Sequence, residues 1–424
     1  MERHVLCIDL KSFFASVECV ERHIDPFKVN LVVANPNQGN GAITLAITPH
    51  LKSLGIKSRT RLYEIPKNIK YVIVPPRMSL YIKKSKEVVG IYLDFVAEED
   101  LHIYSIDECF LDVTHYLKMY KMTDYELAQK ILKTIEEKTG LTATCGIGSN
   151  MLLAKLSMDI EAKKYKNGIA KWTMDDVPSK LWPIRPLSKM WSIGPRMEKK
   201  LNTMGMVTVG DIANHDKNDL KKKFGVIGEE LWNHANGIDL SVISDWKVTP
   251  KNSSYSHSQV LFKDYYGENI KLIIEEMIDV VCQRLRKNHK QAGLIGLGIG
   301  YSKAIGGGFF HSIKVNPTDS NVEFLKVALN MFDRYYEEKP IRKVSVSAGN
   351  LINKETEQLS LFESLEEKEN EFKANEAIDE IKNKFGKNSI VKASSLLDYS
   401  TAMERNRRLE VIMPEIHDRG MIKW

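Results

Sequence analysis

A pair of adjacent carboxylates inside an apolar, strand-like run constrains the fold of this chain more than any other feature. The run extends from Tyr104 to Val113, and Asp107 and Glu108 lie within it. A buried strand does not tolerate unpaired charge, so carboxylates in such a position usually hold a metal ion or a cationic partner. The alternative interpretation is a surface hairpin that the two carboxylates only cap.

A similar arrangement occurs at the N-terminus, where the apolar strand that includes Ile8 ends in Asp9. Asp9, Asp107 and Glu108 together would suit a two-metal phosphoryl-transfer site, in which two divalent ions about 3.5–4 Å apart bind the attacking and leaving oxygens. Hard carboxylate oxygens favour Mg²⁺, which takes further ligands from water and substrate phosphates. We therefore expect these three residues to be the catalytic residues and the ligands of two Mg²⁺ ions.

Length and composition favour a globular protein with several domains. The 424 residues, 43% of them hydrophobic and 27% charged, suggest about two to four domains. The net charge of +6 suits a polyanionic partner. The five cysteines form no CxxC pair, which argues against structural zinc and favours a reducing, cytoplasmic location. We see no secretion leader and no apolar stretch long enough for a membrane span.

The first 240 residues divide into three parts. Residues 1–23 and 76–170 carry strand and helix patterns that predict two halves of one α/β domain, around a small insertion at residues 24–75. Paired prolines at 75 and 76 mark the return from this insertion. Residues 171–240 read as short helices rich in lysine.

The remainder begins with a polar linker, residues 241–252. Residues 253–351 follow the β-α-β-β-α-β order of a ferredoxin-like split unit. Residues 352–424 form a tail with a helical C-terminal part, and its acidic stretch, residues 353–380, predicts a mobile tether.

Two motifs connect the carboxylates to a known family. Ser-Ile-Asp-Glu-Cys-Phe-Leu-Asp, residues 105–112, resembles the second catalytic motif of Y-family, or translesion, DNA polymerases. Asp-Leu-Lys-Ser-Phe-Phe-Ala-Ser-Val-Glu, residues 9–18, resembles their first. The resemblance is closest to the UmuC/UvrX branch and extends to about Leu351, with a weaker match in the tail.

This resemblance implies an α/β and α+β multidomain fold, the right hand of a polymerase. Residues 1–23 and 76–170 would form the palm, 24–75 the fingers, 171–240 the helical thumb and 253–351 the ferredoxin-like little finger. The implied activity is template-directed DNA synthesis from dNTPs on a primer 3′-hydroxyl. The implied role is low-fidelity bypass of lesions in DNA repair, as part of the SOS response to DNA damage.

The resemblance also implies a set of nucleotide contacts. Phe14 holds the position of an aromatic steric gate, whose ring would collide with a ribose 2′-hydroxyl. The alternative is that Phe13 and Phe14 are both core residues, and for Phe13 we favour the core. Lys163 resembles the lysine that contacts the triphosphate, although Lys164 and Lys166 are close by. The implied contacts are Leu10, Phe13, Phe14, Thr48, Lys52 and Lys163.

The chain departs from a common family pattern between Thr44 and Lys52. Many members place a Tyr and, three residues on, an Arg against the triphosphate, whereas this chain has Pro49 and Lys52. Lys52 offers a point charge without the bidentate geometry of arginine, and Thr48 offers one hydroxyl.

DNA contacts are expected in two places. Gly194 and Arg196 belong to a segment that resembles a helix-hairpin-helix, in which backbone amides at a helix N-terminus approach a phosphate. In the proposed little finger, Lys303, Arg342 and Lys343 lie on or beside strands and are expected to contact phosphates. Each feature alone also fits an ordinary turn or a solvated strand residue.

The tail contains a short peptide that matches the sliding-clamp (beta) motif of bacterial polymerases. Apolar residues in an acidic tether have no core to join, so Gln358, Leu359, Leu361 and Phe362 are candidate anchors. Accessory subunits of the UmuD type are a further possible partner. The alternative functions are a catalytically weak DNA- and clamp-binding accessory protein of the DNA damage response, and a palm-type nucleotidyl cyclase. The latter needs neither a DNA-gripping hairpin nor a clamp peptide.

Overall fold

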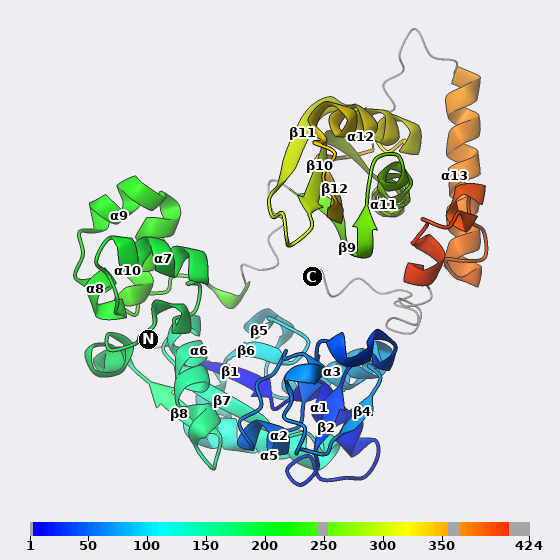
Figure 1. The fold of residues 1–424 in the computed structure, drawn as a ribbon. Helices are drawn as coiled ribbons and strands as arrows, with labels where there is room; N and C mark the ends of the chain where they lie inside the picture. Colours follow the sequence, from blue (N-terminus) through cyan, green and yellow to red (C-terminus); the bar gives the residue numbers. More distant parts are fainter. Residues whose placement is uncertain (1–2, 245–252, 355–364, 407–424) are drawn as a thin grey trace. The chain divides into compact units, whose positions relative to one another are not determined.

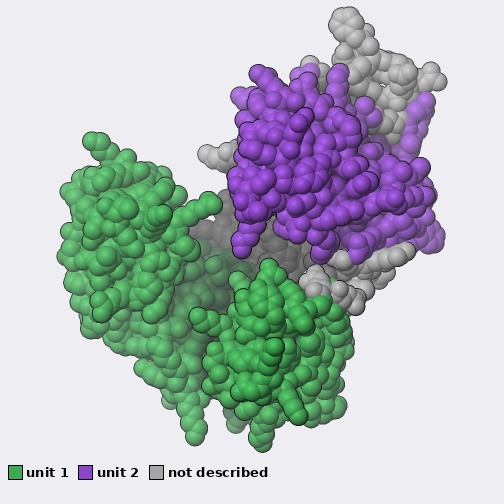
Figure 2. Space-filling view, in the orientation of Figure 1, with its two compact units in different colours: residues 1–248 green, residues 249–424 purple. Residues whose placement is uncertain are grey.

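The computed structural model of the chain describes residues 3–244, 253–354 and 365–406. The chain forms two compact units, residues 1–248 (unit 1) and 249–424 (unit 2), which Figure 2 shows in green and purple. In these described ranges, no helix is both long enough and apolar enough to cross a membrane. All five cysteines are buried free thiols.

A five-stranded sheet forms the centre of unit 1, with β1 as its middle strand (Figure 1). Strand β1 is antiparallel to β6 and β7, and β7 is parallel to β8. Because side chains alternate along a strand, Leu6, Ile8 and Leu10 enter the main core, and Cys7 and Asp9 belong to the opposite face. In spatial order the strands are β5 (Leu101–Ile103), β6 (Glu108–Asp112), β1 (Val5–Leu10), β7 (Ala143–Gly148) and β8 (Ile169–Trp172).

The carboxylate run is therefore not one continuous strand. Glu108 begins β6, and Asp107 ends the hairpin loop that joins β5 to β6. The predicted strand that ends near Asp9 is confirmed.

Helices cover both faces of this sheet. α3 and α5 contribute to the core on the Leu6 face, and α6 packs on the other face. α6 approaches β7 so closely that a Cβ on Gly146 would lie only 2.0 Å from the Ala154 carbonyl oxygen. The helices of this part are α1 (Phe13–Val20), α3 (Met78–Leu93), α4 (Tyr116–Tyr120), α5 (Asp124–Thr139) and α6 (Met151–Ile160).

A second, smaller sheet lies between α1 and α3 in the sequence and has its own apolar cluster. Strand β2 (Leu31–Val33) pairs in parallel with β4 (Val72–Val74) and antiparallel with β3 (Ala46–Ile47). The short helix α2 (Pro49–Ser53) follows β3. These elements agree with the predicted insertion between two halves of the larger sheet.

Four short helices follow the large sheet: α7 (Pro195–Thr203), α8 (Val209–Ala213), α9 (Lys217–Phe224) and α10 (Val226–Ala235). Their apolar residues share one cluster with α6 and Trp172. The predicted boundary at residues 170 and 171 falls inside β8, a strand that the sequence pattern did not reveal.

Unit 2 contains a four-stranded antiparallel sheet with α11 and α12 on one face (Figure 1). The predicted β-α-β-β-α-β order is confirmed. The strand order β11-β10-β12-β9 corrects the ferredoxin-like prediction, because the second and fourth strands are central here instead of the first and third. The elements are β9 (Tyr255–Tyr265), α11 (Asn269–Lys287), β10 (Lys290–Tyr301), β11 (Gly308–Thr318), α12 (Asn321–Tyr335) and β12 (Ile341–Asn353).

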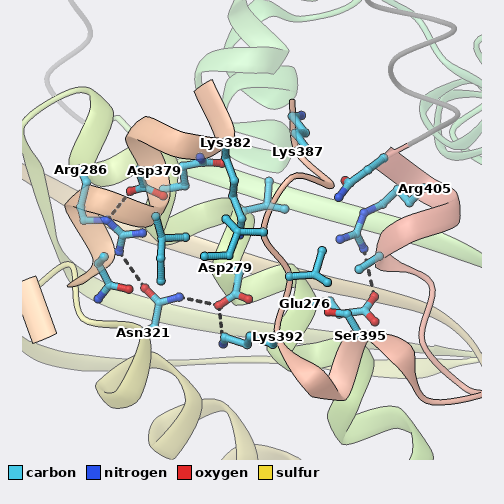
Figure 3. A pocket seen from close by; sticks show the side chains of 18 residues that line it. Glu276, Asp279, Arg286, Asn321, Asp379, Lys382, Lys387, Lys392, Ser395 and Arg405 are labelled. Atoms are coloured by element: carbon cyan, nitrogen blue, oxygen red, sulfur yellow. Dashed lines mark hydrogen bonds and ion pairs between the residues drawn. The ribbon is translucent and has the colours of Figure 1, made fainter. Parts of the chain in front are cut away.

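The acidic tail is not a tether along its whole length. Helix α13 (Leu365–Phe385) and residues 386–406 pack against α11, and Figure 3 shows the pocket that they enclose with it. Arg286 Nε lies 2.7 Å from Asp379, and Lys392 Nζ lies 2.9 Å from both Glu275 and Asp279. The predicted clamp peptide, Gln358, Leu359, Leu361 and Phe362, lies outside the described residues.

Candidate active site

Two of the three predicted catalytic carboxylates lie opposite each other on adjacent strands. Asp9 of β1 pairs in register with Glu108 of β6. Asp107 directly precedes Glu108, and its carbonyl accepts a hydrogen bond from the Leu10 amide at 2.9 Å. The carboxylate of Asp107 accepts a bond from Ser105 Oγ at 2.7 Å. Residues about 100 positions apart in the chain are thus brought to one edge of the sheet.

Helix α6 and the turn after it surround these carboxylates with alternating charges. Lys155 Nζ lies 2.8 Å from Glu108 and 3.0 Å from Asp159. Lys163 Nζ lies 2.7 Å from Asp159 and 3.4 Å from Asp9. The result is a chain of ion pairs that joins Asp9 to Glu108 through two lysines and one further carboxylate.

Burial changes the proton affinity of this site. The pKa of Asp9 is raised to about 6, chiefly by desolvation; the charge of Lys163 opposes this shift, and the charges of Asp107 and Glu108 add to it. Desolvation alone would lower the pKa of Lys155, but Glu108, with smaller contributions from Cys7 and Asp159, outweighs it, and the pKa of this lysine is raised. Lys155 is therefore a permanent cation. The negative charges of Asp107 and Glu108 repel that of Asp9, and a bound cation would relieve this repulsion.

The donor chemistry of the site suits a hard divalent ion. Asp9, Asp107 and Glu108 offer oxygen ligands only, which Mg²⁺ and similar ions prefer. Among the described residues, no three His, Cys, Asp or Glu side chains converge closely enough to form a complete metal cluster. Mg²⁺ is usually held by one or two carboxylates together with substrate phosphates, so a complete protein cage is not required.

The two phenylalanines have different environments. Phe13 is 2% exposed and lies in the main core, which corrects its inclusion among the nucleotide contacts. Phe14 is half-buried, and its ring stacks on Tyr81. Leu10 is buried at the end of β1. Ser12, at the N-cap of α1, has φ 50° and turns the chain between β1 and these rings.

The two predicted nucleotide contacts of the insertion, Thr48 and Lys52, have different environments. Thr48 is fully buried, and its hydroxyl donates to the Val29 carbonyl at 2.7 Å. Thr48 is therefore a structural residue, which corrects the prediction. Partial desolvation lowers the pKa of Lys52, and the charges of Asp9 and Asp107 oppose this shift. Lys52 thus lies within electrostatic reach of the carboxylates.

All three lysines of the run, Lys163, Lys164 and Lys166, are exposed, and Lys163 is the one that pairs with Asp9. The spacing of this helix carries a signal that the sequence reading missed. Lys155, Asp159 and Lys163 recur every four residues, the spacing of one helix face, although in the structure α6 ends at Ile160 and Lys163 lies in the turn after it.

The predicted DNA contacts lie on exposed surface in both units. Gly194 is the N-cap of α7 and Arg196 follows in its first turn. Lys303 lies in the β10–β11 hairpin, and Lys343 belongs to the open face of the unit 2 sheet, opposite Gly300. Arg342 pairs with Asp264 at 2.9 Å.

Comparison with known families identifies the chain. The model of the impB/mucB/samB family matches residues 8–159, its C-terminal domain matches residues 252–361, and the helix-hairpin-helix (HHH) motif of the IMS family matches residues 175–206. The chain is 42% identical over 407 residues to the UvrX protein of Bacillus subtilis (strain 168), covering 95% of this chain and 96% of that protein.

The chain belongs to the Y family of DNA polymerases. Two further relatives agree. DNA polymerase IV 2 of Bacillus subtilis (strain 168) is 33% identical over 96% of this chain and 98% of its own length. DNA polymerase IV of Pelotomaculum thermopropionicum is 31% identical over 95% of this chain and 97% of its own length.

This Y-family member is a UvrX-like, DNA-directed DNA polymerase of the translesion class. Such an enzyme uses primer-template DNA and dNTPs and depends on a divalent metal ion. The matched residues 8–159 include all three carboxylates of the predicted site. The same range includes Lys155 and Asp159, which sequence reasoning did not select.

Proposed function

We propose that the enzyme extends primers past DNA lesions by two-metal nucleotidyl transfer at Asp9, Asp107 and Glu108. The observation that carries this proposal is the register pairing of Asp9 with Glu108, beside Asp107 and within reach of Lys163. Bound there, two Mg²⁺ ions would lower the pKa of the primer 3′-hydroxyl and neutralise charge on the triphosphate and the leaving pyrophosphate.

The surrounding residues would hold the incoming nucleotide. Lys163 and Lys52 bring two positive charges to the carboxylate edge, which suits the triphosphate. Phe14 would lie beneath the sugar and exclude a 2′-hydroxyl. The ion pair with Lys155 orients the carboxylate of Glu108.

We also assign these elements to the four parts of the right-hand polymerase fold. The large sheet with α1 and α3–α6 would be the palm, the small sheet with α2 the fingers, α7–α10 the thumb, and the sheet of unit 2 the little finger. Gly194 and Arg196 would grip the duplex backbone without reading sequence. Lys343, with Lys303 on the neighbouring hairpin, would contact phosphates from the open sheet face.

We further propose that residues 358–362 recruit the sliding clamp, as their composition suggests. Recruitment would bring the enzyme to stalled primer ends in the SOS response, with accessory subunits of the UmuD type as a second possible contact. We also propose a cytoplasmic location for the enzyme, because its five cysteines form no CxxC pair.

A primer-extension assay on undamaged and lesion-containing templates tests the catalytic proposal. The double variant Asp107→Ala with Glu108→Ala is expected to lose extension at every Mg²⁺ concentration, because the ligands of the ions are gone. DNA affinity, measured by fluorescence anisotropy, is expected to stay within about twofold of the wild type, since the phosphate contacts lie elsewhere.

A matched control comes from Glu98→Ala with Glu99→Ala, which removes two adjacent, exposed carboxylates from the same part of unit 1. This control is expected to extend primers normally. Robust extension by the Asp107/Glu108 variant would overturn the proposed site.

A further inference from the structure

We propose that Tyr81 is a positioning residue for sugar selection, because it forms a rigid floor beneath the Phe14 ring. The inference rests on the proposed role of Phe14 as the steric gate and deepens it. It names a second residue, on a different helix, that determines how strongly the enzyme discriminates between deoxyribonucleotides and ribonucleotides.

The contact between the two rings is close and nearly parallel. The ring centroids of Phe14 and Tyr81 are 4.5 Å apart, with an interplanar angle of 16°. Phe13 packs beside both, at 5.6 Å from Phe14 and 6.4 Å from Tyr81. Tyr81 is fully buried, whereas Phe14 remains half-buried. One face of the Phe14 ring is therefore covered by protein.

Tyr81 is itself fixed by a buried charge. Its hydroxyl donates to Glu18 Oε1 at 2.7 Å, and Glu18 is fully buried. Arg77 donates to the same carboxylate through Nε at 3.0 Å and Nη2 at 2.7 Å, and Arg22 also pairs with it. A carboxylate held by two guanidinium groups and one phenol has little freedom to move.

The protonation states support this arrangement. Burial alone would raise the pKa of Glu18, but hydrogen bonds from Arg77, Tyr81 and Arg22 outweigh it, so the pKa is lowered and the carboxylate stays charged. Burial, together with the bond to Glu18, raises the pKa of Tyr81, which therefore remains a hydrogen-bond donor at neutral pH.

The floor also links the gate to the fingers-like insertion. Arg77 is the N-cap residue of α3 and directly follows the paired prolines that end the insertion, and Tyr81 lies one turn further along α3. A functional side chain generally has to be held within about 0.5 Å of its working position by the residues behind it. Without the Tyr81 ring, Phe14 can sink toward the core and leave room for a 2′-hydroxyl.

The test is the ratio of kcat/KM for a deoxyribonucleotide to that for the matching ribonucleotide. Tyr81→Leu is expected to reduce this ratio about tenfold, the usual scale for losing a shaped apolar contact. Tyr81→Phe keeps the ring and loses only the bond to Glu18, so a smaller reduction of about threefold is expected. Phe14→Ala is measured alongside as the variant that removes the gate itself.

Two controls separate positioning from general destabilisation. Tyr92 is a second buried tyrosine of α3, at 1% exposure, and it has no ring stacking with Phe14; Tyr92→Leu is expected to lower the melting temperature but leave the ratio unchanged. In the Phe14→Ala background, Tyr81→Leu is expected to have no additional effect on the ratio, because it acts only through Phe14.

Each outcome decides between specific alternatives. An unchanged ratio in Tyr81→Leu, or an equal loss in Tyr92→Leu, would overturn the inference while the gate stands. If Phe14→Ala leaves the ratio unchanged, the gate proposal fails first. If Tyr81→Leu does not fold, Tyr81→Phe decides, since wild-type selectivity in that variant would overturn the inference that a Tyr81 ring held by Glu18 positions Phe14.

Discussion

At the scale of single residues, Lys155 is the charge on which the geometry of the carboxylates most depends. It is 8% exposed and lies between Glu108 and Asp159, both within 3.0 Å of its Nζ. Removing one partner from a buried ion pair leaves an uncompensated charge and typically costs about 3–5 kcal/mol. Lys155→Met is therefore expected to lower the free energy of unfolding by about this amount and to abolish extension.

Thermal unfolding and primer extension measure the two effects of Lys155→Met. Lys164→Met, which removes an exposed lysine nine residues on, is the control and is expected to behave as the wild type. Lys155→Arg keeps the charge and is expected to recover most of the stability. A Lys155→Met enzyme with wild-type stability would contradict the view that this lysine holds Glu108.

The sequence predicted the residues of this site better than their environment. The motifs pointed to Asp9, Asp107 and Glu108, and the register of β1 with β6 brings the strand ends that carry them together. Thr48 could not be judged from the sequence, because only the fold reveals that the Val29 carbonyl uses its hydroxyl. Lys155 was missed since a lysine on a helix is usually solvated, although its spacing from Asp159 was visible.

At the scale of elements, the contact between α6 and β7 positions both lysines of the site. A side chain at Gly146 would lie 2.0 Å from the Ala154 carbonyl oxygen and 2.4 Å from the Met158 amide nitrogen. These are backbone atoms of α6 and cannot move aside alone. Gly146→Ala is expected to push α6 off the sheet and to lower stability by about 1–3 kcal/mol, the usual cost of overpacking.

Gly90→Ala is the matched control for this variant. Gly90 is exposed within α3, and a Cβ there would meet nothing within 4 Å. That substitution is expected to raise stability by about 0.5–1 kcal/mol, since alanine favours a helix interior over glycine. Chemical denaturation measures the free energy of unfolding of both variants. Equal stabilities of Gly146→Ala and Gly90→Ala would show that α6 and β7 are not in tight contact.

Predictions of elements succeeded where periodicity was strong. In unit 2 the periodicities of strands and helices predicted the order of the six elements. Periodicity does not specify which strands pair, so the central positions of β10 and β12 were not predictable. β8 has only four residues and was missed, and the charge of the tail obscured the first half of α13, although a helical part of the tail was predicted.

At the scale of the whole molecule, the segment that follows residues 355–364 packs against α11 of unit 2. Lys354, just before this stretch, pairs with Asp319 at 3.2 Å, and beyond it α13 and residues 386–406 are held by α11. Figure 3 shows Glu276 and Arg405 facing each other across this contact. In the sequence, the proposed clamp peptide therefore lies between two segments that pack on other parts of unit 2.

Glu276 is the residue on which this docking depends. It is 4% exposed and accepts hydrogen bonds from Ser400 Oγ at 2.7 Å and Thr401 Oγ1 at 2.8 Å, and it pairs with Arg405. Glu276→Ala leaves these donors without their acceptor. We expect the variant to release residues 386–406 to limited proteolysis while clamp-free extension on a short primer-template stays normal, because the proposed active site lies in unit 1.

The control is Glu268→Ala, which removes an exposed carboxylate next to the start of α11 and is expected to retain wild-type protection. Unchanged protection in Glu276→Ala would contradict the anchoring role of this carboxylate, and a collapse of clamp-free extension would make the C-terminal segment part of the catalytic machinery.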